Sequence, residues 1–168
     1  MLTEDEEKFL LHFPADKIVR IQPYDSKTTE IGQQIINEVH GVLPDTEVVM
    51  IGSAAAKIAG QNDIDVYALA PQAEQPELLP ALKGLYGEPT HVGKNFFEWN
   101  FEREGFEVEF YLSEFDHSMS RQLKVTQILS SDPKIAKEFE ALKLQYDGKS
   151  YRDYHRAKYE FYHKILGD

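Results

Sequence analysis

Two short strand-like segments separated by a Gly-Ser break limit the fold of this chain more than any other feature. Thr46–Ile51 is an apolar, β-branched run, which predicts a central strand. Gly52 and Ser53 interrupt this run, and Ala54–Ala59 then predicts a short helix. Asp63–Leu69 alternates between polar and apolar residues, which predicts a second strand. An Asp-x-Asp sequence therefore follows Gly-Ser after nine residues.

The residue types in this segment suit the binding of phosphate and metal. Gly52 has no Cβ, so the backbone can approach a phosphate closely. Ser53 lies at the expected start of a helix, where exposed amides favour anions. Asp63 and Asp65 are two residues apart on a strand, so they share one face, roughly 6.6 Å apart along it. A Mg²⁺ or Mn²⁺ cofactor between the two carboxylates would remove their repulsion and hold substrate phosphates.

A later strand offers a third carboxylate. Phe106, Val108, Phe110 and Leu112 alternate toward the core, so Glu107 and Glu109 point together to the other face. We select Glu109 as a metal ligand or as the base that takes a proton from an acceptor hydroxyl, with Glu107 as the alternative. The same pattern is also typical of an acidic strand exposed to solvent, so that interpretation stays open for both pairs of acids.

An apolar strand, Gly-Ser, a short helix and Asp-x-Asp in a strand together resemble the pattern of polymerase-β-like nucleotidyltransferases. The resemblance implies catalytic and metal-binding roles for Asp63, Asp65 and Glu109. It implies nucleotide binding by the Gly52-Ser53 turn. Lys57 could reach a phosphate from the short helix, or it could be an ordinary surface lysine. Lys158 could complete a triphosphate site from the last helix, or it could form a tertiary salt bridge.

Several stretches also resemble the GrpB family, over roughly residues 17–166. The early turn Pro23-Tyr24-Asp25 and the strand end Ile51-Gly52-Ser53 match positions of the family pattern, with Met50 where the family has histidine. The C-terminal third has the most specific spacing, which comprises Asp132-Pro133, Glu138-Phe139, Leu142-Lys143, Tyr154-x-x-x-Lys158 and Phe161. The resemblance implies a nucleotidyltransferase-like fold and links the chain to nucleotide or coenzyme A metabolism.

The sequence also departs from the GrpB pattern at the expected site. The loop after the glycine reads Ser53-Ala54-Ala55-Ala56-Lys57 where the family has Ser-Thr-Ala-Val-Pro-Gly. The His-x-His of the family's later strand is Glu107-x-Glu109 here. These changes favour a three-carboxylate transferase site in this chain over the usual GrpB arrangement.

The rest of the chain predicts a mixed α/β (α+β) fold with a nucleotidyltransferase-like sheet of about five strands. Lys17–Gln22 alternates like a strand, with Ile18 and Arg20 on one face, and Thr28–His40 has helical spacing. Further predicted elements are a helix after Thr3, a helix from Pro76 to about Leu85, a hairpin of Phe96–Phe101 with Phe106–Leu112, and helices that begin near Phe115, Pro133 and Tyr151. We expect one domain over residues 1–168, with residues 113–168 as its helical C-terminal part.

The composition excludes some classes of partner. The chain has 29 acidic and 18 basic residues, a net charge of −11, and no cluster of Lys and Arg that would bind long nucleic acid by counterion release. It has no cysteine, which excludes disulfides and thiol nucleophiles. Its apolar stretches are too short to span a membrane, and its acidic N-terminal segment is unlike a secretory signal. We therefore expect a cytoplasmic protein without a membrane partner.

Two functions fit these observations. In the first, the chain is a metal-dependent nucleotidyltransferase that moves a nucleotidyl group from a nucleoside triphosphate to an unknown hydroxyl acceptor. In the second, it is a catalytically inactive GrpB-like module that binds a nucleotide or a protein. The two hypotheses differ in whether the three carboxylates converge on one metal ion.

Overall fold

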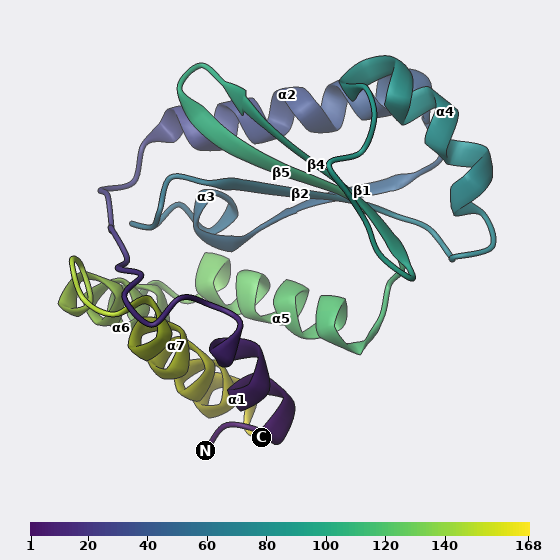
Figure 1. Cartoon of the computed structure of the whole chain (residues 1–168). Helices are drawn as coiled ribbons and strands as arrows, with labels where there is room; N and C mark the ends of the chain where they lie inside the picture. Colours follow the sequence, from purple (N-terminus) through teal and green to yellow (C-terminus); the bar gives the residue numbers. More distant parts are fainter.

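The chain forms one mixed sheet with helices on both faces (Figure 1). The computed structural model describes all 168 residues. The strands are β1 (Glu47–Ile51), β2 (Ile64–Leu69), β3 (His91–Val92), β4 (Phe96–Arg103) and β5 (Phe106–Ser113). The helices are α1 (Glu4–Leu11), α2 (Ser26–Val42), α3 (Gly52–Ala56), α4 (Gln75–Tyr86), α5 (His117–Ser131), α6 (Pro133–Gln145) and α7 (Tyr151–Leu166).

The sheet has the strand order β1-β2-β5-β4-β3. Strands β2 and β5 are parallel, and every other neighbouring pair is antiparallel. The predicted mixed sheet of about five strands is therefore confirmed. The prediction that Thr46–Ile51 is a central strand is wrong, because β1 lies at the edge. Its residues are apolar because α2 contacts it on one side and α3 and α5 also pack against it.

The predicted strand at Lys17–Gln22 is also wrong. This segment forms only isolated bridges, from Ile18 to Ser150 and from Gln22 to Gly60. Its buried residues are Val19 and Ile21, whereas Ile18 and Arg20 are exposed. The segment crosses the loop between α6 and α7, where the Val19 amide donates to the Lys149 carbonyl at 2.9 Å. Alternation indicated that one side is buried, but the burial is against this loop and not within the sheet.

The main core lies between the sheet and the layer formed by α2 and α4, which covers one face in Figure 1. Strands β2 and β5 supply its centre with Ile64, Val66, Val108 and Phe110, all at most 1% exposed. Since side chains alternate along a strand, the intervening residues of β2 and β5 point to the opposite face. The apolar core therefore directs Asp65 and Glu109 toward the second layer of helices.

Helices α5, α6, α7 and α1 form the layer below the sheet in Figure 1. The predicted helix starts are confirmed: Asp132 caps α6 by accepting from the Lys134 amide at 2.9 Å, and Ser150 caps α7. A second core, which includes Phe139 and Phe161, joins α5, α6 and α7. Arg152 of α7 donates to the Phe13 carbonyl at 2.8 Å and so anchors the segment after α1.

None of the seven helices has both the length and the apolar composition needed to span a membrane.

Two helical glycines provide a test of how closely α2 packs on β1. A Cβ at Gly32 of α2 would lie 2.3 Å from Met50 Sδ, whereas a Cβ at Gly84 of α4 would meet nothing within 4 Å. We expect Gly84→Ala to raise the free energy of unfolding by about 0.5–1 kcal/mol, because alanine favours the helix. We expect Gly32→Ala to lose most of this gain, because the Met50 side chain would have to move away from α2. Urea unfolding of both variants measures this, and equal stabilisation by the two would contradict the close α2–β1 contact.

Candidate active site

The Gly-Ser turn brings the backbone directly against Asp65. Helix α3 begins at Gly52, immediately after β1, and Gly52 has φ of 78°. A Cβ at this position would lie 3.2 Å from Asp65 Oδ2. The left-handed conformation and the close approach both require glycine here. Helix α3 spans Gly52–Ala56 and so begins and ends earlier than the predicted Ala54–Ala59, because its C-cap Lys57 is left-handed, with φ of 58°.

One small cavity gathers most of the predicted site residues. It has a volume of about 50 Å³ and is lined by five of them: Gly52, Ser53, Asp63, Asp65 and Lys158. Residues from α5, α6 and α7 complete its walls. Lys57 is exposed and does not line this cavity, so the structure does not bring it to the site. The Gly-Ser turn expected to bind phosphate and the two aspartates expected to bind metal therefore line the same cavity.

Asp65 and Glu109 lie side by side on the parallel strands β2 and β5, where they are register partners. Burial raises the pKa of Asp65 well above its usual range, and the charges of Asp63 and Glu109 raise it further. Burial also raises the pKa of Glu109, against the effect of a hydrogen bond from Asp65. Burial and the two neighbouring acids thus favour the neutral form of Asp65. Glu107 is exposed two residues away, so the structure favours Glu109 as the partner of Asp65.

Asp63 is close enough to raise the pKa of both carboxyl groups but does not complete a metal cluster. It lies immediately before β2 and lines the small cavity. No group of three or more His, Asp or Glu side chains in the chain is arranged to hold a metal ion. Glu109 instead lines a neighbouring hollow with Glu107, Glu102 and Asn100. In the structure, therefore, Asp65 and Glu109 form a pair that Asp63 influences through its charge.

Lys158 supplies positive charge from α7. Its Nζ lies over the Tyr162 ring at 5.6 Å from the centroid. Burial lowers the pKa of Lys158, but the surrounding oxygens of Tyr162, Tyr154 and Tyr159, together with Asp63, more than reverse this effect, so the net direction is upward. Lys158 therefore remains an ammonium beside the carboxylates. It does not form the tertiary salt bridge that was its alternative role.

A second lysine, Lys143 of α6, was not predicted as a site residue. Lys143 is 3% exposed, and its Nζ donates to Ser53 Oγ and to the Ala59 carbonyl, the latter at 3.1 Å. Glu140, one turn earlier, accepts from the Ala59 amide at 2.6 Å. Helix α6 thus holds the loop after the Gly-Ser turn by both polar groups of Ala59. Burial lowers the pKa of Lys143 to about 7, and the charge of Lys158 acts in the same direction.

The sequence did contain a signal for Lys143. Ala136, Phe139 and Lys143 are the buried residues of α6, at the spacing of one helical face. A lysine on an otherwise apolar face is seldom buried unless it has a partner. In the sequence, Leu142-Lys143 stands out only as part of the resemblance to GrpB, which implies no role for Lys143 at the site.

Comparison with known proteins agrees with the geometry. A family model described as GrpB protein matches residues 18–168. A structure of the Cid1 poly(U) polymerase with MgGTP bound has a TM-score of 0.52 and 15% identity, and covers 84% of this chain and 45% of that chain. A second Cid1 structure, described by its RNA terminal uridylyl transferase activity, has a TM-score of 0.54 and 11% identity, and covers 83% and 43%. No curated protein gives a significant match.

These structural neighbours establish a nucleotidyltransferase-like fold. The chain spans less than half the length of the neighbours, at 45% and 43% of their chains.

Lys143 makes the stability of the protein depend on pH in a defined window. Its pKa is about 7 in the folded protein, below the usual value of 10.5, so between these values the unfolded chain binds more protons. Stability therefore rises with pH in this window, by up to about 1.4 kcal/mol per pH unit from this group. We expect the unfolding free energy of the wild type, minus that of Lys143→Met, to increase between pH 7 and pH 10. Urea unfolding measures this, and a flat difference would show that Lys143 is charged in the folded state.

Proposed function

This chain belongs to the GrpB family, and on that premise we propose that it is a metal-dependent nucleotidyltransferase. It would move a nucleotidyl group from a nucleoside triphosphate to a hydroxyl group of an acceptor. The observation that carries the proposal is the pairing of Asp65 with Glu109 next to a cavity that also contains Ser53, Lys143 and Lys158. Carboxylates for a cation thus adjoin donors for phosphate.

The donors come from two layers of the fold. Ser53 and the amides of the Gly-Ser turn approach from the sheet, and Lys143 and Lys158 approach from α6 and α7. Backbone amides and ammonium groups both bind phosphate oxygens, and together they would hold the β- and γ-phosphates away from the carboxylates. Lys143 Nζ donates to Ser53 Oγ, so these two groups lie together in the lining of the cavity where a phosphate would bind.

The residues beside Asp65 suit a divalent cation. Asp65, Glu109 and Asp63 offer only hard oxygen donors, which Mg²⁺ and Mn²⁺ prefer. Burial raises the pKa of Asp65, the charges of Asp63 and Glu109 raise it further, and Lys158 offsets this only in part. Bound Mg²⁺ or Mn²⁺ would supply charge neutralisation for the phosphates at this position. Glu109, whose pKa is raised by burial, would accept the proton of the acceptor hydroxyl.

A second function is favoured by one specific observation. The three carboxylates expected from the sequence do not form a metal-binding group as the side chains stand. A GrpB-like module without catalysis would retain the anion-binding turn and lysines, and it would bind a nucleotide or a protein without transferring anything. Metal-dependent binding through Asp65 and Glu109 separates the two functions.

Calorimetric titration of ATP with Mn²⁺ tests the proposed function, and GTP, CTP and UTP follow under the same conditions. We expect binding to the wild type that depends on Mn²⁺ and is lost in Asp63→Ala/Asp65→Ala, because the cation would have no ligands on β2. We expect Glu109→Gln to weaken the binding of Mn²⁺ by about tenfold or more, because one charged ligand is removed.

Glu107→Gln is the matched control for Glu109→Gln, since it removes an exposed carboxylate from the same face of the same strand. It should bind Mn²⁺ and nucleotide like the wild type. Nucleotide binding that persists without Mn²⁺ and in the double variant would support the inactive module. No binding of any of the four nucleotides to the wild type would exclude the transferase.

A further inference from the structure

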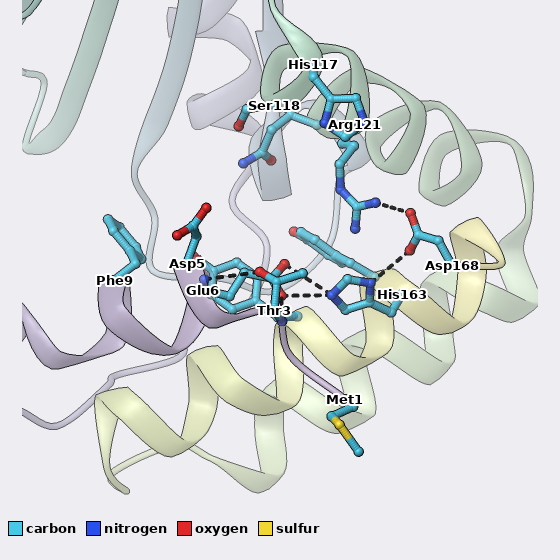
Figure 2. Close-up of a pocket in the computed structure, with 13 residues that line it drawn as sticks. Met1, Thr3, Asp5, Glu6, Phe9, His117, Ser118, Arg121, His163 and Asp168 are labelled. Carbon is cyan, nitrogen blue, oxygen red and sulfur yellow. Dashed lines mark hydrogen bonds and ion pairs between the residues drawn. The ribbon is translucent and has the colours of Figure 1, made fainter.

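A second, much larger cavity lies between α1, α5 and α7 (Figure 2). Its volume is about 830 Å³, within the range that holds a small organic molecule. Phe9, Tyr159 and Tyr162 give it an apolar, aromatic wall. Ser118 and Gln122 of α5 add polar groups opposite that wall. The proposed function places the nucleotide and the cation at the small cavity and leaves this larger cavity without a ligand.

The cavity adjoins the candidate active site at two places. Tyr162 lines both this cavity and the small cavity that contains Asp63, Asp65 and Lys158, and it is only 9% exposed. Ser118 and Gln122 also line a hollow with Tyr67 and Tyr111, whose rings are stacked at 4.5 Å. The Tyr111 hydroxyl in turn lies 3.4 Å from Glu109 Oε2. A molecule in the large cavity is therefore separated from the paired carboxylates by single side chains.

A hydrogen-bonded chain fixes the walls of the cavity, as Figure 2 shows. His163 of α7 bonds Glu6 of α1 at 2.9 Å and Asp168 at 2.8 Å, and Asp168 pairs with Arg121 of α5. The hydrogen bond with Glu6, opposed by burial, raises the pKa of His163. Helices α1, α5 and α7 are thus tied together around the space.

The same chain determines which charge a ligand would meet. The cations that line the cavity, Arg121 and His163, are already bonded to Asp168 and Glu6. Asp5 also lines the cavity, and its only ion-pair partner is the exposed Lys8 at 3.8 Å. Asp5 is thus the one charged side chain of the lining whose partner lies outside the cavity, and its carboxylate disfavours an anion and favours a neutral or positively charged molecule.

We propose that this cavity binds the acceptor of the proposed reaction, a small neutral or cationic molecule that has a hydroxyl group and an aromatic or apolar face. The assignment rests on the proposed function. Its ring would pack on the wall formed by Phe9, Tyr159 and Tyr162, with any ammonium toward Asp5. The hydroxyl would extend past Tyr162 toward Asp65, whose register partner is Glu109.

The proposed transfer is an in-line displacement at the α-phosphorus of the nucleotide. The acceptor oxygen forms a bond to the α-phosphorus, and the bond from that phosphorus to its bridging oxygen breaks. Pyrophosphate leaves with the electron pair of the broken bond, held by Ser53 and the two lysines. The proton of the hydroxyl passes to Glu109. The products are the nucleotidylated acceptor and pyrophosphate.

Three probes with one ring and different charge test the cavity: tyramine (cationic), tyrosol (neutral) and 4-hydroxyphenylacetate (anionic). Binding to the full chain is followed by saturation-transfer NMR and calorimetry. We expect tyramine to bind at least about threefold more tightly than 4-hydroxyphenylacetate at low salt, because Asp5 faces the cavity. Asp5→Asn should reduce this preference.

Ser118→Phe fills the cavity and should weaken tyramine binding by about tenfold or more. Ser130→Phe, at an exposed position of the same helix outside the cavity, is the matched control and should leave binding unchanged. Thermal unfolding of both variants confirms that they fold. Binding of Mn²⁺-ATP should be the same in both variants and the wild type.

Four results would overturn the inference. Tyramine and tyrosol could fail to bind although Mn²⁺-ATP binds, or tyramine could bind equally to Ser118→Phe; either leaves the proposed function standing without this acceptor site. Displacement of tyramine by Mn²⁺-ATP would assign the cavity to the nucleoside instead. Tyramine binding that Ser118→Phe abolishes, in a protein that binds no nucleotide, would overturn the transfer reaction and with it the acceptor role.

Discussion

The parallel pairing of β2 with β5 is the constraint on which both the sheet and the candidate site depend. Parallel neighbours cannot be joined by a tight turn, so α4, β3 and β4 lie between them in the chain. The pairing places Val66 beside Phe110 on the core face and Asp65 beside Glu109 on the other face. A slip of one residue on either strand would turn its carboxylate into the core beneath α2. The hydrophobic core that fixes the register therefore also fixes the position of the acids.

Much of the fold followed from the sequence, because its signals were local. The hairpin of β4 and β5 and the capped starts of α1, α6 and α7 each depend on a few neighbouring residues, such as Thr3, Asp132 and Ser150. Two predictions depended on distant partners and were wrong. The apolar β1 is an edge strand covered by helices, and Lys17–Gln22 packs against the α6–α7 loop. Periodicity reports which side of a segment is buried, and it cannot report which element buries it.

In the candidate site, too, local features followed from the sequence and features that depend on distant partners did not. The Gly52-Ser53 turn and the spacing of Asp63 and Asp65 are short-range features of the sequence. The preference for Glu109 over Glu107 depends on the pairing of β5 with β2, which alternation along one strand cannot supply. Lys143 was missed because its partners, Ser53 and Ala59, are far from it in the sequence. The metal-binding role of the three carboxylates stays a prediction, because the side chains as they stand form no group that could hold a metal ion. Asp63 lies immediately before β2, so alternation within the strand does not fix the direction of its side chain.

The charges of the site offset each other only in part, and this shapes what the site can bind. Asp63, Asp65 and Glu109 face Lys158 and a Lys143 whose pKa is lowered to about 7 by burial and by Lys158. Burial and the neighbouring acids raise the pKa of Asp65, and burial and Lys158 lower the pKa of Lys143. A cation beside the acids and a polyanion beside the lysines would each reduce the part of these shifts that comes from neighbouring charge. A nucleotide with its divalent cation brings opposite charges in that arrangement, whereas either one alone would relieve only half of the imbalance.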